Sequence, residues 1–434
     1  MYLVYSLLLT VGLLILSPYF LFQAWRHGKY LPSLRERLGR VPASADGAPV
    51  IWLHCVSVGE TQAARPLAQA LRERFPEHNL VVSTTTLTGQ QVAREVFAQL
   101  ASQVIYFPFD WRFAVRRALD RIRPSLVVIM ETELWPNFLR ECGRRKTPVV
   151  VANGRLSAKS FRNYSWINGF MRRVLANVGW AAMQSPDDAD RLGKLGLPPE
   201  RISVTGNIKF DAGESAADES LAAELKARFA PEAGRPMVIA ASTHDPEEEV
   251  CLSAMRKVTS GGTPARLLIA PRHPERFADV AELLNRSGCA WARRTAPPSP
   301  SDAAAEVILL DSIGELRAAL TLGDLVFVGG SIAPTGGHNV LEPAALVKCI
   351  VTGSHTFNFN EIMRVFREAG ALVQLPPLKY AEAARELGRE LSELLTDADR
   401  RRQMGERAGA VVIANRGATR RTIEGIAKLV PSAE

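Results

Sequence analysis

Residues 50–75, VIWLHCVSVGETQAARPLAQALRERF, contain the unit from which the fold is built. The apolar run over 50–56 predicts a buried strand, and the stretch after it has the apolar spacing of a helix. The same pairing of strand and helix recurs further along the chain. The other predicted strands cover 80–85, 104–109, 126–130, 148–153, 179–184, 202–207, 236–242, 266–271, 307–312, 324–331 and 349–353. This alternation predicts parallel sheets in an α/β fold.

The length of 434 residues is comfortable for two domains. Residues 211–236 are rich in Ala, Glu, Gly and Asp and are interpreted as an interdomain connection that contains a helix. We therefore expect doubly wound domains over 45–210 and 237–398 that face each other across a cleft. Basic helices over 399–434 are expected to pack back toward the first domain. In such domains ligands bind at the carboxyl ends of the strands.

The N-terminal segment differs from the rest of the chain, because residues 2–25 carry no charge. This is about the length of a helix that crosses the hydrocarbon core of a membrane. The basic residues that follow it are Arg26, Lys29, Arg35, Arg37 and Arg40. By the positive-inside rule they predict a membrane-anchor helix over 1–28 with the bulk of the protein in the cytoplasm. Ser17 and Pro18 weaken a crossing helix, so a helix that lies in the membrane interface is the alternative.

The net charge of +8, from 53 basic and 45 acidic residues, favours anionic partners such as a membrane surface or a phosphorylated substrate. A nucleic-acid enzyme is unsupported, because the basic residues are spread out and form no RNA-module signature. The five cysteines are scattered without C-x-x-C spacing, which indicates a reduced, cytosolic catalytic region and no thiolate zinc site. The common nucleotide-binding, hydrolase and metalloprotease motifs are also missing from the sequence.

The octapeptide HCVSVGET at 54–61 places Glu60 three residues after Ser57, at a junction of strand and helix. This is the spacing of a capping box, in which the Ser57 hydroxyl accepts a helix N–H and the Glu60 carboxylate accepts the Ser57 N–H. Glu60 also lies at the carboxyl end of a strand, where a carboxylate can act as a general base on a bound ligand. The octapeptide alone favours the cap. Cys55 is interpreted as a core residue rather than a nucleophile.

Polar residues follow two further strands in the first half of the chain. In ETELWPN (131–137), Glu131 comes directly after a buried strand and is expected to point into the cleft. Glu133 is expected to cap the helix that follows. In GNIKFD (206–211), Lys209 is either a solvated lysine or a site residue, and the sequence alone does not choose between them.

The acidic run DDAD at 187–190 resembles a metal-binding pattern but follows Ser185 and Pro186. Serine before a first-turn proline is typical of a helix start, and acidic residues in a first turn suit the helix dipole. We therefore interpret the run as the beginning of a helix. The seven histidines have no metal-ligand spacing.

Three stretches in the second half have the features of phosphate-binding loops. Arg272 and His273 lie between a strand and a helix in APRHPERF (270–277), where a cation and free backbone N–H groups suit a phosphate. The segment 311–316, DSIGEL, repeats this arrangement. In 328–346, VGGSIAPTGGHNVLEPAAL, a strand runs into a glycine-rich loop whose amides can approach a phosphate. An ordinary glycine-rich turn before a helix is the alternative.

The stretches SVGE, ETELWPN, GNIKFD, STHDPEEE, PRHPERF, GGHNVLEPA and GSHTFNF occur in an order and spacing that resemble the Kdo (3-deoxy-D-manno-octulosonic acid) transferases of Gram-negative bacteria. The likeness covers nearly the whole chain. It implies a GT-B glycosyltransferase with two Rossmann-like domains. It also implies inverting transfer of Kdo from CMP-Kdo to the lipid A precursor lipid IVA in lipopolysaccharide biosynthesis, on the cytoplasmic side of the inner membrane.

The resemblance also implies roles for individual residues. Glu60 is expected to be the general base, and Glu131 and Lys209 are expected to stabilise the transition state. The residues expected to bind CMP-Kdo are Pro271, Arg272, Ile313, Gly314, Glu315, Asn339, Val340, Leu341 and Glu342. Those expected on the acceptor side are Ser57, Glu133 and Arg155. The family requires no metal, and no cofactor is expected.

Without the resemblance, two alternatives compete: a membrane-tethered nucleotide-binding protein without Kdo transfer, and a sugar-nucleotide-modifying enzyme. A Glu60→Ala variant that loses turnover and still binds CMP distinguishes the transferase from both. The segment SFRNYSWINGFMRR (160–173) interleaves aromatic and basic side chains. It is interpreted either as a contact with lipid headgroups or as an amphipathic helix packed on the sheet.

Overall fold

The computed structural model describes residues 1–27, 33–43, 47–211, 216–229 and 235–430. Several predicted features lie outside the described residues: Lys29, the end of the anchor at residue 28, the domain start at residue 45 and parts of the connection over 211–236. The chain forms two compact units. Unit 1 comprises Met1–Asp211 and Asn415–Glu434, and unit 2 comprises Ala212–Ala414.

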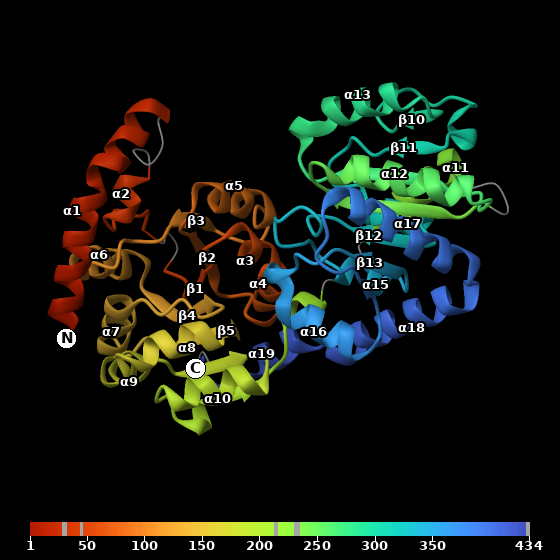
Figure 1. The fold of residues 1–434 in the computed structure, drawn as a ribbon. Helices are drawn as coiled ribbons and strands as arrows, with labels where there is room; N and C mark the ends of the chain where they lie inside the picture. Colours follow the sequence, from red (N-terminus) through yellow and green to blue (C-terminus); the bar gives the residue numbers. More distant parts are fainter. Residues whose placement is uncertain (28–32, 44–46, 212–215, 230–234, 431–434) are drawn as a thin grey trace. The chain divides into compact units, whose positions relative to one another are not determined.

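Unit 1 is built on a seven-stranded parallel sheet with the order β3-β2-β1-β4-β5-β6-β7, and helices cover both of its faces (Figure 1). Its strands are β1 (Val50–His54), β2 (Asn79–Thr84), β3 (Gln103–Tyr106), β4 (Pro124–Met130), β5 (Val149–Gly154), β6 (Trp180–Met183) and β7 (Ile202–Val204). Its helices are α1 (Tyr2–His27), α2 (Leu34–Arg37), α3 (Val58–Ala63), α4 (Arg65–Arg74), α5 (Leu87–Val96), α6 (Arg112–Ile122), α7 (Pro136–Arg144), α8 (Ala158–Ser165), α9 (Asn168–Leu175), α10 (Pro186–Lys194), η1 (Pro199–Arg201), η2 (Ile208–Asp211) and α19 (Ala418–Ala427).

Successive residues of β1 face opposite sides of the sheet. Trp52 belongs to a core cluster that includes Phe138, whereas Leu53 belongs to a second cluster that includes Leu67. All five residues of β1 are buried. Because a parallel strand covered on both faces has no solvent side, its sequence is a continuous apolar run. This is the pattern that predicts a strand from residue 50 onward.

The C-terminal segment completes unit 1. Helix α19 adds Ala418, Ile423 and Ile426 to the cluster that contains Leu53. At the start of this helix, the Asp211 carboxylate accepts hydrogen bonds from the backbone N–H groups of residues 417 and 419, at 2.6 and 2.5 Å. The two segments of unit 1, which are far apart in the sequence, therefore share one core.

Unit 2 has the same architecture, with the strand order β10-β11-β9-β8-β12-β13-β14 and all neighbours parallel (Figure 1). Its strands are β8 (Met237–Thr243), β9 (Arg266–Pro271), β10 (Trp291–Arg293), β11 (Val307–Leu309), β12 (Leu325–Val328), β13 (Cys349–Thr352) and β14 (Val373–Gln374). Its helices are α11 (Ala216–Phe229), α12 (Glu247–Ser260), η3 (Pro274–Arg276), α13 (Phe277–Ser287), η4 (Asp302–Ala304), α14 (Leu316–Ala319), η5 (Leu320–Leu322), α15 (Leu341–Ala345), η6 (Phe357–Phe359), α16 (Asn360–Glu368), α17 (Tyr380–Thr396) and α18 (Ala398–Asn415).

The structure confirms the predicted α/β fold with parallel sheets. Strands β10 and β14 were not predicted, because they have only three and two residues and show no apolar period. The strand predicted over 50–56 is too long, since β1 ends at His54 and the chain then turns into α3. The predicted C-terminal block 399–434 is divided between the two units at residue 415.

Helix α1 lies against unit 1 through one face (Figure 1). The Tyr2 ring meets the Phe170 ring edge-on at 5.2 Å, and the Thr10 hydroxyl accepts a hydrogen bond from the Trp111 indole at 3.0 Å. The opposite face exposes the apolar side chains of Leu3, Val4, Leu7, Leu8, Val11, Leu14, Ile15 and Leu16. Over the described residues, none of the helices combines the length and apolar character that a bilayer crossing requires, so the predicted transmembrane helix is not confirmed.

Candidate functional site

Glu60 lies in the first turn of α3, directly after the carboxyl end of β1. Its carboxylate accepts hydrogen bonds from the Val56 backbone N–H at 2.8 Å and from the Ser57 hydroxyl at 3.0 Å. The Ser57 hydroxyl also accepts the Glu60 N–H at 3.4 Å as the N-cap of the helix. The predicted helix cap by Ser57 is confirmed, and Glu60 lies at the carboxyl end of a strand as expected. One detail of the predicted capping box was wrong: the carboxylate binds the N–H of Val56 rather than that of Ser57.

The environment of Glu60 changes its acidity. The residue is only 8% exposed, and burial raises the pKa of its carboxyl to about 7. The hydrogen bond from Val56 opposes this rise, while the negative charge of Glu131 adds to it. A carboxyl group with a pKa near the working pH exchanges its proton readily, which is the property of an effective general base.

Glu131 follows β4 in a left-handed backbone conformation, with φ of 54°. Its N–H donates to the carbonyl oxygen of Ala152 at 2.9 Å. A non-glycine residue in this conformation is strained and is often found at functional sites. Burial, and the nearby charge of Glu131, raise the pKa of Glu133. Carboxyl groups at 60, 131 and 133 thus act on one another electrostatically at this edge of the sheet.

The predicted capping role of Glu133 was wrong. The N-terminus of α7 is capped instead by Asp110, whose carboxylate accepts the N–H groups of Asn137 at 2.9 Å and Phe138 at 2.7 Å. Burial raises the pKa of Asp110 to about 7, against the effect of these two hydrogen bonds. Trp135, the residue before the helix, packs against Phe107 at a ring distance of 5.9 Å. Glu133 is therefore left without a capping function.

Lys209 lies on η2, just after β7, and a chain of amide side chains fixes this segment. The Asn153 carbonyl oxygen accepts the Gln184 side-chain amide at 3.0 Å, and Gln184 in turn accepts that of Asn207 at 3.1 Å. Asn207 then accepts the Lys209 N–H at 3.0 Å, and the Asn153 side chain accepts the Ile208 N–H at the same distance. The ends of β5, β6 and β7 therefore position the lysine backbone together.

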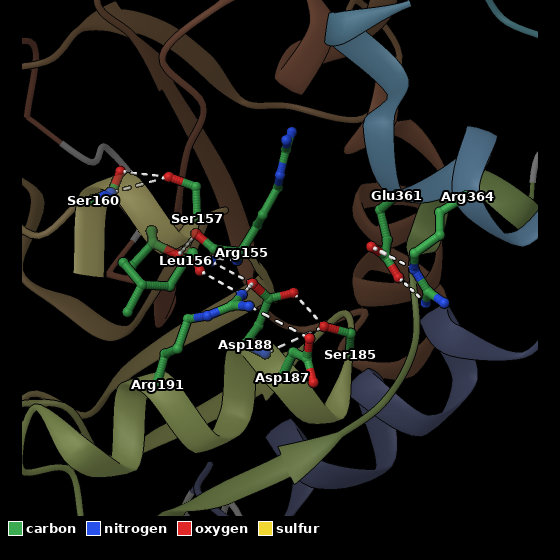
Figure 2. Close-up of polar contacts among 11 residues, drawn as sticks. Arg155, Leu156, Ser157, Ser160, Ser185, Asp187, Asp188, Arg191, Glu361 and Arg364 are labelled. Atoms are coloured by element: carbon green, nitrogen blue, oxygen red, sulfur yellow. Dashed lines mark hydrogen bonds and ion pairs between the residues drawn. The ribbon is translucent and has the colours of Figure 1, made fainter. Parts of the chain in front are cut away.

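Arg155 follows β5 and is tied to the loop after β4. The Thr132 hydroxyl donates to the Arg155 carbonyl at 2.6 Å and accepts its N–H at 2.9 Å. In Figure 2 the guanidinium extends away from the cluster around Asp188. Ser157 begins the next helix by accepting the Ser160 N–H at 3.1 Å.

The acidic run at 187–190 is structural, as predicted. Ser185 caps α10, and the buried Asp188 carboxylate accepts the Leu156 N–H at 2.8 Å and the Ser185 hydroxyl at 2.5 Å (Figure 2). In unit 2, Figure 2 also draws Glu361 and Arg364, an ion pair at 2.5 Å within the single helix α16. Cys55 is fully buried in the core, as the sequence indicated, and burial raises the pKa of its thiol.

In unit 2 the predicted donor-site residues lie on three loops at strand ends. Pro271 ends β9, and the Arg272 N–H donates to the Thr243 carbonyl at 3.0 Å, while its side chain is exposed. Ile313 is 79% exposed, and Gly314 has a φ of 84° that favours glycine. The third residue of this loop, Glu315, pairs with an arginine at 2.7 Å, which lowers its pKa.

The glycine-rich loop ends in a local hydrogen-bonded turn. The Asn339 side chain accepts the Leu341 N–H at 3.1 Å and donates to the Glu342 carboxylate at 3.1 Å. Val340 and Leu341 are buried, so only their backbone atoms can face a ligand. The four residues predicted to bind the donor therefore offer a ligand the side chains of Asn339 and Glu342 and the backbone of Val340 and Leu341.

Sequence reasoning missed three residues of this region: His244, Glu247 and His338. The two imidazole rings stack at 5.0 Å with their Nε2 atoms 2.8 Å apart. Glu247 is fully buried. The motifs STHDPEEE and GGHNVLEPA contain these residues, but nothing in their spacing along the chain indicates that they meet. Within the part of the chain that the structure describes, no group of three or more His, Cys, Asp or Glu side chains is placed to hold a metal ion.

Comparison with known proteins places the chain in a family. Residues 32–212 match the family model described as 3-deoxy-D-manno-octulosonic-acid transferase (kdotransferase). The 3-deoxy-D-manno-octulosonic acid transferase of Haemophilus influenzae is 36% identical over 91% of this chain and 91% of its own length. The chain belongs to the Kdo transferase family. It is therefore a glycosyltransferase, and the resemblance found in the sequence motifs is confirmed.

Further comparisons agree with the family and with the fold. The 3-deoxy-D-manno-octulosonic acid transferase of Bordetella pertussis is 34% identical over 96% of this chain and 97% of its own length. The UDP-GlcNAc 2-epimerase of Neisseria meningitidis, solved with UDP-GlcNAc, has a similar fold with a TM-score of 0.56. That likeness covers 88% of this chain and 100% of the epimerase at 14% identity, and it concerns the fold alone.

Proposed function

We propose that this Kdo transferase family member moves Kdo from CMP-Kdo to the lipid A precursor lipid IVA, with inversion at the anomeric carbon, in lipopolysaccharide biosynthesis. In this reaction the acceptor hydroxyl attacks the face opposite the CMP phosphate. The bond from the sugar to the phosphate oxygen breaks as the new glycosidic bond forms, and the hydroxyl proton passes to a base. The two sheets and the related folds are consistent with a GT-B architecture.

The observation that carries this proposal is the environment of Glu60. Its carboxylate is held at the carboxyl end of β1 by the Val56 N–H and the Ser57 hydroxyl, and burial raises its pKa to about 7. Such a group accepts a proton at neutral pH and is oriented before the substrate binds. General-base catalysis of this kind is worth about 10²–10⁴-fold in rate. Glu60 is therefore our catalytic base.

Glu131 and Lys209 are proposed to stabilise the transition state. An oxocarbenium-like transition state carries positive charge on the sugar ring and negative charge on the departing phosphate. The strained Glu131 places a carboxylate beside the base, and the amide chain ending at Lys209 fixes an ammonium-bearing segment. Fixed charges of this kind act without reorganisation during the reaction.

The donor site is proposed to use the three loops of unit 2 that carry Arg272, Gly314 and Asn339. The positive φ of Gly314 leaves room for the backbone to approach a ligand. The acceptor is proposed to contact Ser57, Glu133 and Arg155 in unit 1. Arg155 supports this choice, because its guanidinium extends away from the neighbouring polar cluster in Figure 2.

Membrane attachment is proposed to occur through the exposed face of α1. Since its other face is hydrogen-bonded and packed against unit 1, we favour a helix that lies in the membrane interface on the cytoplasmic side of the inner membrane. The exposed Trp166, at 87%, lies between α8 and α9 and offers a second contact with lipid headgroups. A lipid acceptor is more easily reached by an enzyme held at this surface.

The function is tested with purified full-length protein, lipid IVA, Kdo, CTP and a CMP-Kdo synthetase. Mass spectrometry should show a product heavier by one or more Kdo units. Glu60→Gln should abolish this product while CMP still binds, and Glu73→Gln, an exposed glutamate on α4, is the matched control. Unmodified lipid IVA with the wild-type protein would refute Kdo transfer, and wild-type turnover by Glu60→Gln would refute the base.

A further inference from the structure

Three histidines meet at the carboxyl ends of neighbouring strands in unit 2. His244 follows β8, His273 follows β9 and His338 lies in the loop after β12, and these strands are adjacent in the sheet. The His244 and His338 rings are nearly parallel, at 8°, with their Nε2 atoms 2.8 Å apart. The His273 ring meets His244 edge-on at 5.1 Å. Residues far apart in the sequence thus form one cluster.

The 2.8 Å contact between the two Nε2 atoms defines the protonation of the pair. One Nε2 must carry a hydrogen and the other a lone pair. Burial lowers the pKa of His338 to about 3 and also lowers that of His244, and the charges of His273 and Arg272 add to both shifts. Both shifts favour the neutral form of the pair. The ring that accepts at Nε2 carries its own hydrogen on Nδ1, where it can donate to a ligand.

The two arginines near the histidine pair, Arg276 and Arg272, differ in their partners. Arg276 is committed to carboxylates, since it lies 3.3 Å from Glu248 and 3.6 Å from Asp245. Among the described residues, the exposed Arg272 guanidinium has no carboxylate partner. The positive charge of Arg272 lowers the pKa of both imidazoles. An oxyanion bound here would be attracted by Arg272 and would receive a hydrogen bond from the histidine pair.

The cluster is held in place by one buried carboxylate. Glu247 accepts N–H groups from the glycine-rich loop, at 2.7–3.1 Å; the donors are Gly330, Ser331, Ile332 and Ala333. It also accepts the N–H of His244 at 3.0 Å. The same carboxylate therefore fixes both loops that carry the stacked rings. A site this rigid needs little reorganisation when a ligand binds.

Gly330 explains how the ring of His338 lies so close to its loop. Its φ is 65°, which favours glycine. A Cβ atom at this position would lie 2.7 Å from the Cδ2 and 2.9 Å from the Nε2 of His338. The glycine thus makes room for the imidazole rather than only for a turn. This is independent evidence that the loop is shaped around the histidine pair.

We propose that His244, His338 and Arg272 together bind the phosphate of the cytidine monophosphate group of the donor. The inference rests on the proposed function and deepens its donor site. Arg272 supplies the charge, the imidazole pair supplies a directed N–H, and Glu247 is a positioning residue for both rings. Neither histidine needs to be protonated, so the site works at neutral pH. The residues that bind the phosphate are then different from those that bind the cytosine and the sugar.

Isothermal titration calorimetry on the full chain tests the site with cytidine, CMP and CMP-Kdo. The variants are His338→Asn and Arg272→Gln, and the control is His78→Asn, a histidine of unit 1. Each variant should weaken CMP binding about 10–100-fold, the usual effect of losing a hydrogen bond to a charged group. Cytidine, which lacks the phosphate, should bind as it does to the wild type. Arg272 is exposed, so its replacement leaves the core of unit 2 intact.

Three results would overturn the phosphate site. Equal loss of cytidine and CMP binding would mean that the pair only supports the fold. Loss confined to CMP-Kdo would mean that the cluster serves the sugar carboxylate. Unchanged CMP affinity in both variants would show that the cluster does not bind the phosphate. By contrast, a wild-type protein that binds neither CMP nor CMP-Kdo would refute the proposed function itself.

Discussion

Replacement of Glu60 by glutamine should move activity and stability in opposite directions. Burial raises the pKa of this carboxyl from its usual 4.5 to about 7. At about 1.36 kcal/mol per pKa unit, the ionised group destabilises the folded state by up to about 3 kcal/mol. Glutamine has nearly the same shape, and its carbonyl can still accept the Val56 N–H. Glu60→Gln should therefore abolish Kdo transfer and stabilise unit 1 at high pH.

The pH dependence follows from the direction of the shift. Because the folded protein holds this proton more tightly than the unfolded chain, the contribution of Glu60 to stability is full below pH 4.5 and is lost as the pH rises through about 7. The Glu60→Gln variant does not lose stability in this way as the pH rises, because glutamine does not ionise. Its melting temperature should match that of the wild type at pH 4 and exceed it at pH 8 by up to roughly 6–12 °C for a unit of this size.

Scanning calorimetry at pH 4 and pH 8, beside the mass-spectrometric transfer assay, measures both effects. Glu73→Gln makes the same chemical change at an exposed site of unit 1 and should alter neither. A difference in melting temperature that does not change with pH would refute the assignment of the raised pKa to Glu60. Retained transfer would refute its role as the base.

The other predictions concern the charge of Glu131, the cap of α7 and the exposed face of α1. Glu131→Gln removes a negative charge that raises the pKa of Glu60. In initial-rate measurements, the fall of kcat/KM on the acidic side of its pH profile should therefore move to lower pH. An unchanged pH profile would contradict the electrostatic interaction between the two carboxyl groups. Asp110→Ala removes the cap of α7 and should destabilise unit 1 by about 1–2 kcal/mol, measured by calorimetry; unchanged melting would exclude the cap. Leu7→Glu with Leu14→Glu places charges on the exposed face of α1 and should reduce sedimentation with phospholipid vesicles, whereas unaltered sedimentation would exclude this face as the membrane contact.

The strands and the Glu60 turn could be predicted because their signals are local. A parallel strand covered on both faces is a run of apolar residues, and β1, β4 and β9 are almost entirely buried. Ser57 and Glu60 are only three residues apart, so their hydrogen bond follows from the geometry of one helical turn. In the same way, Ser185 before Pro186, followed by acidic residues, predicted the start of α10.

The remaining features depend on contacts between distant segments, which the sequence does not reveal. Asp110 caps a helix that begins 26 residues later, while Glu133, which is much nearer, does not. Glu247 is one of three successive glutamates in a first helical turn, where each fits the helix dipole equally well. Only the structure shows that Glu247 accepts the N–H groups of the glycine-rich loop, which lie more than 80 residues further along the chain, whereas the equally buried Glu248 accepts the Thr243 hydroxyl.

The return of the chain to unit 1 has a consequence for how the protein is made. The core around Leu53 lacks Ala418, Ile423 and Ile426 until α19 has been synthesised, and α19 follows every residue of unit 2. Domains generally fold as units during synthesis, so unit 2 can be complete on the ribosome while the earlier half of the chain still exposes apolar surface. Unit 1, which carries Glu60, should thus acquire its native structure last. The proposed base is then not positioned until unit 2, which carries the proposed donor site, has folded.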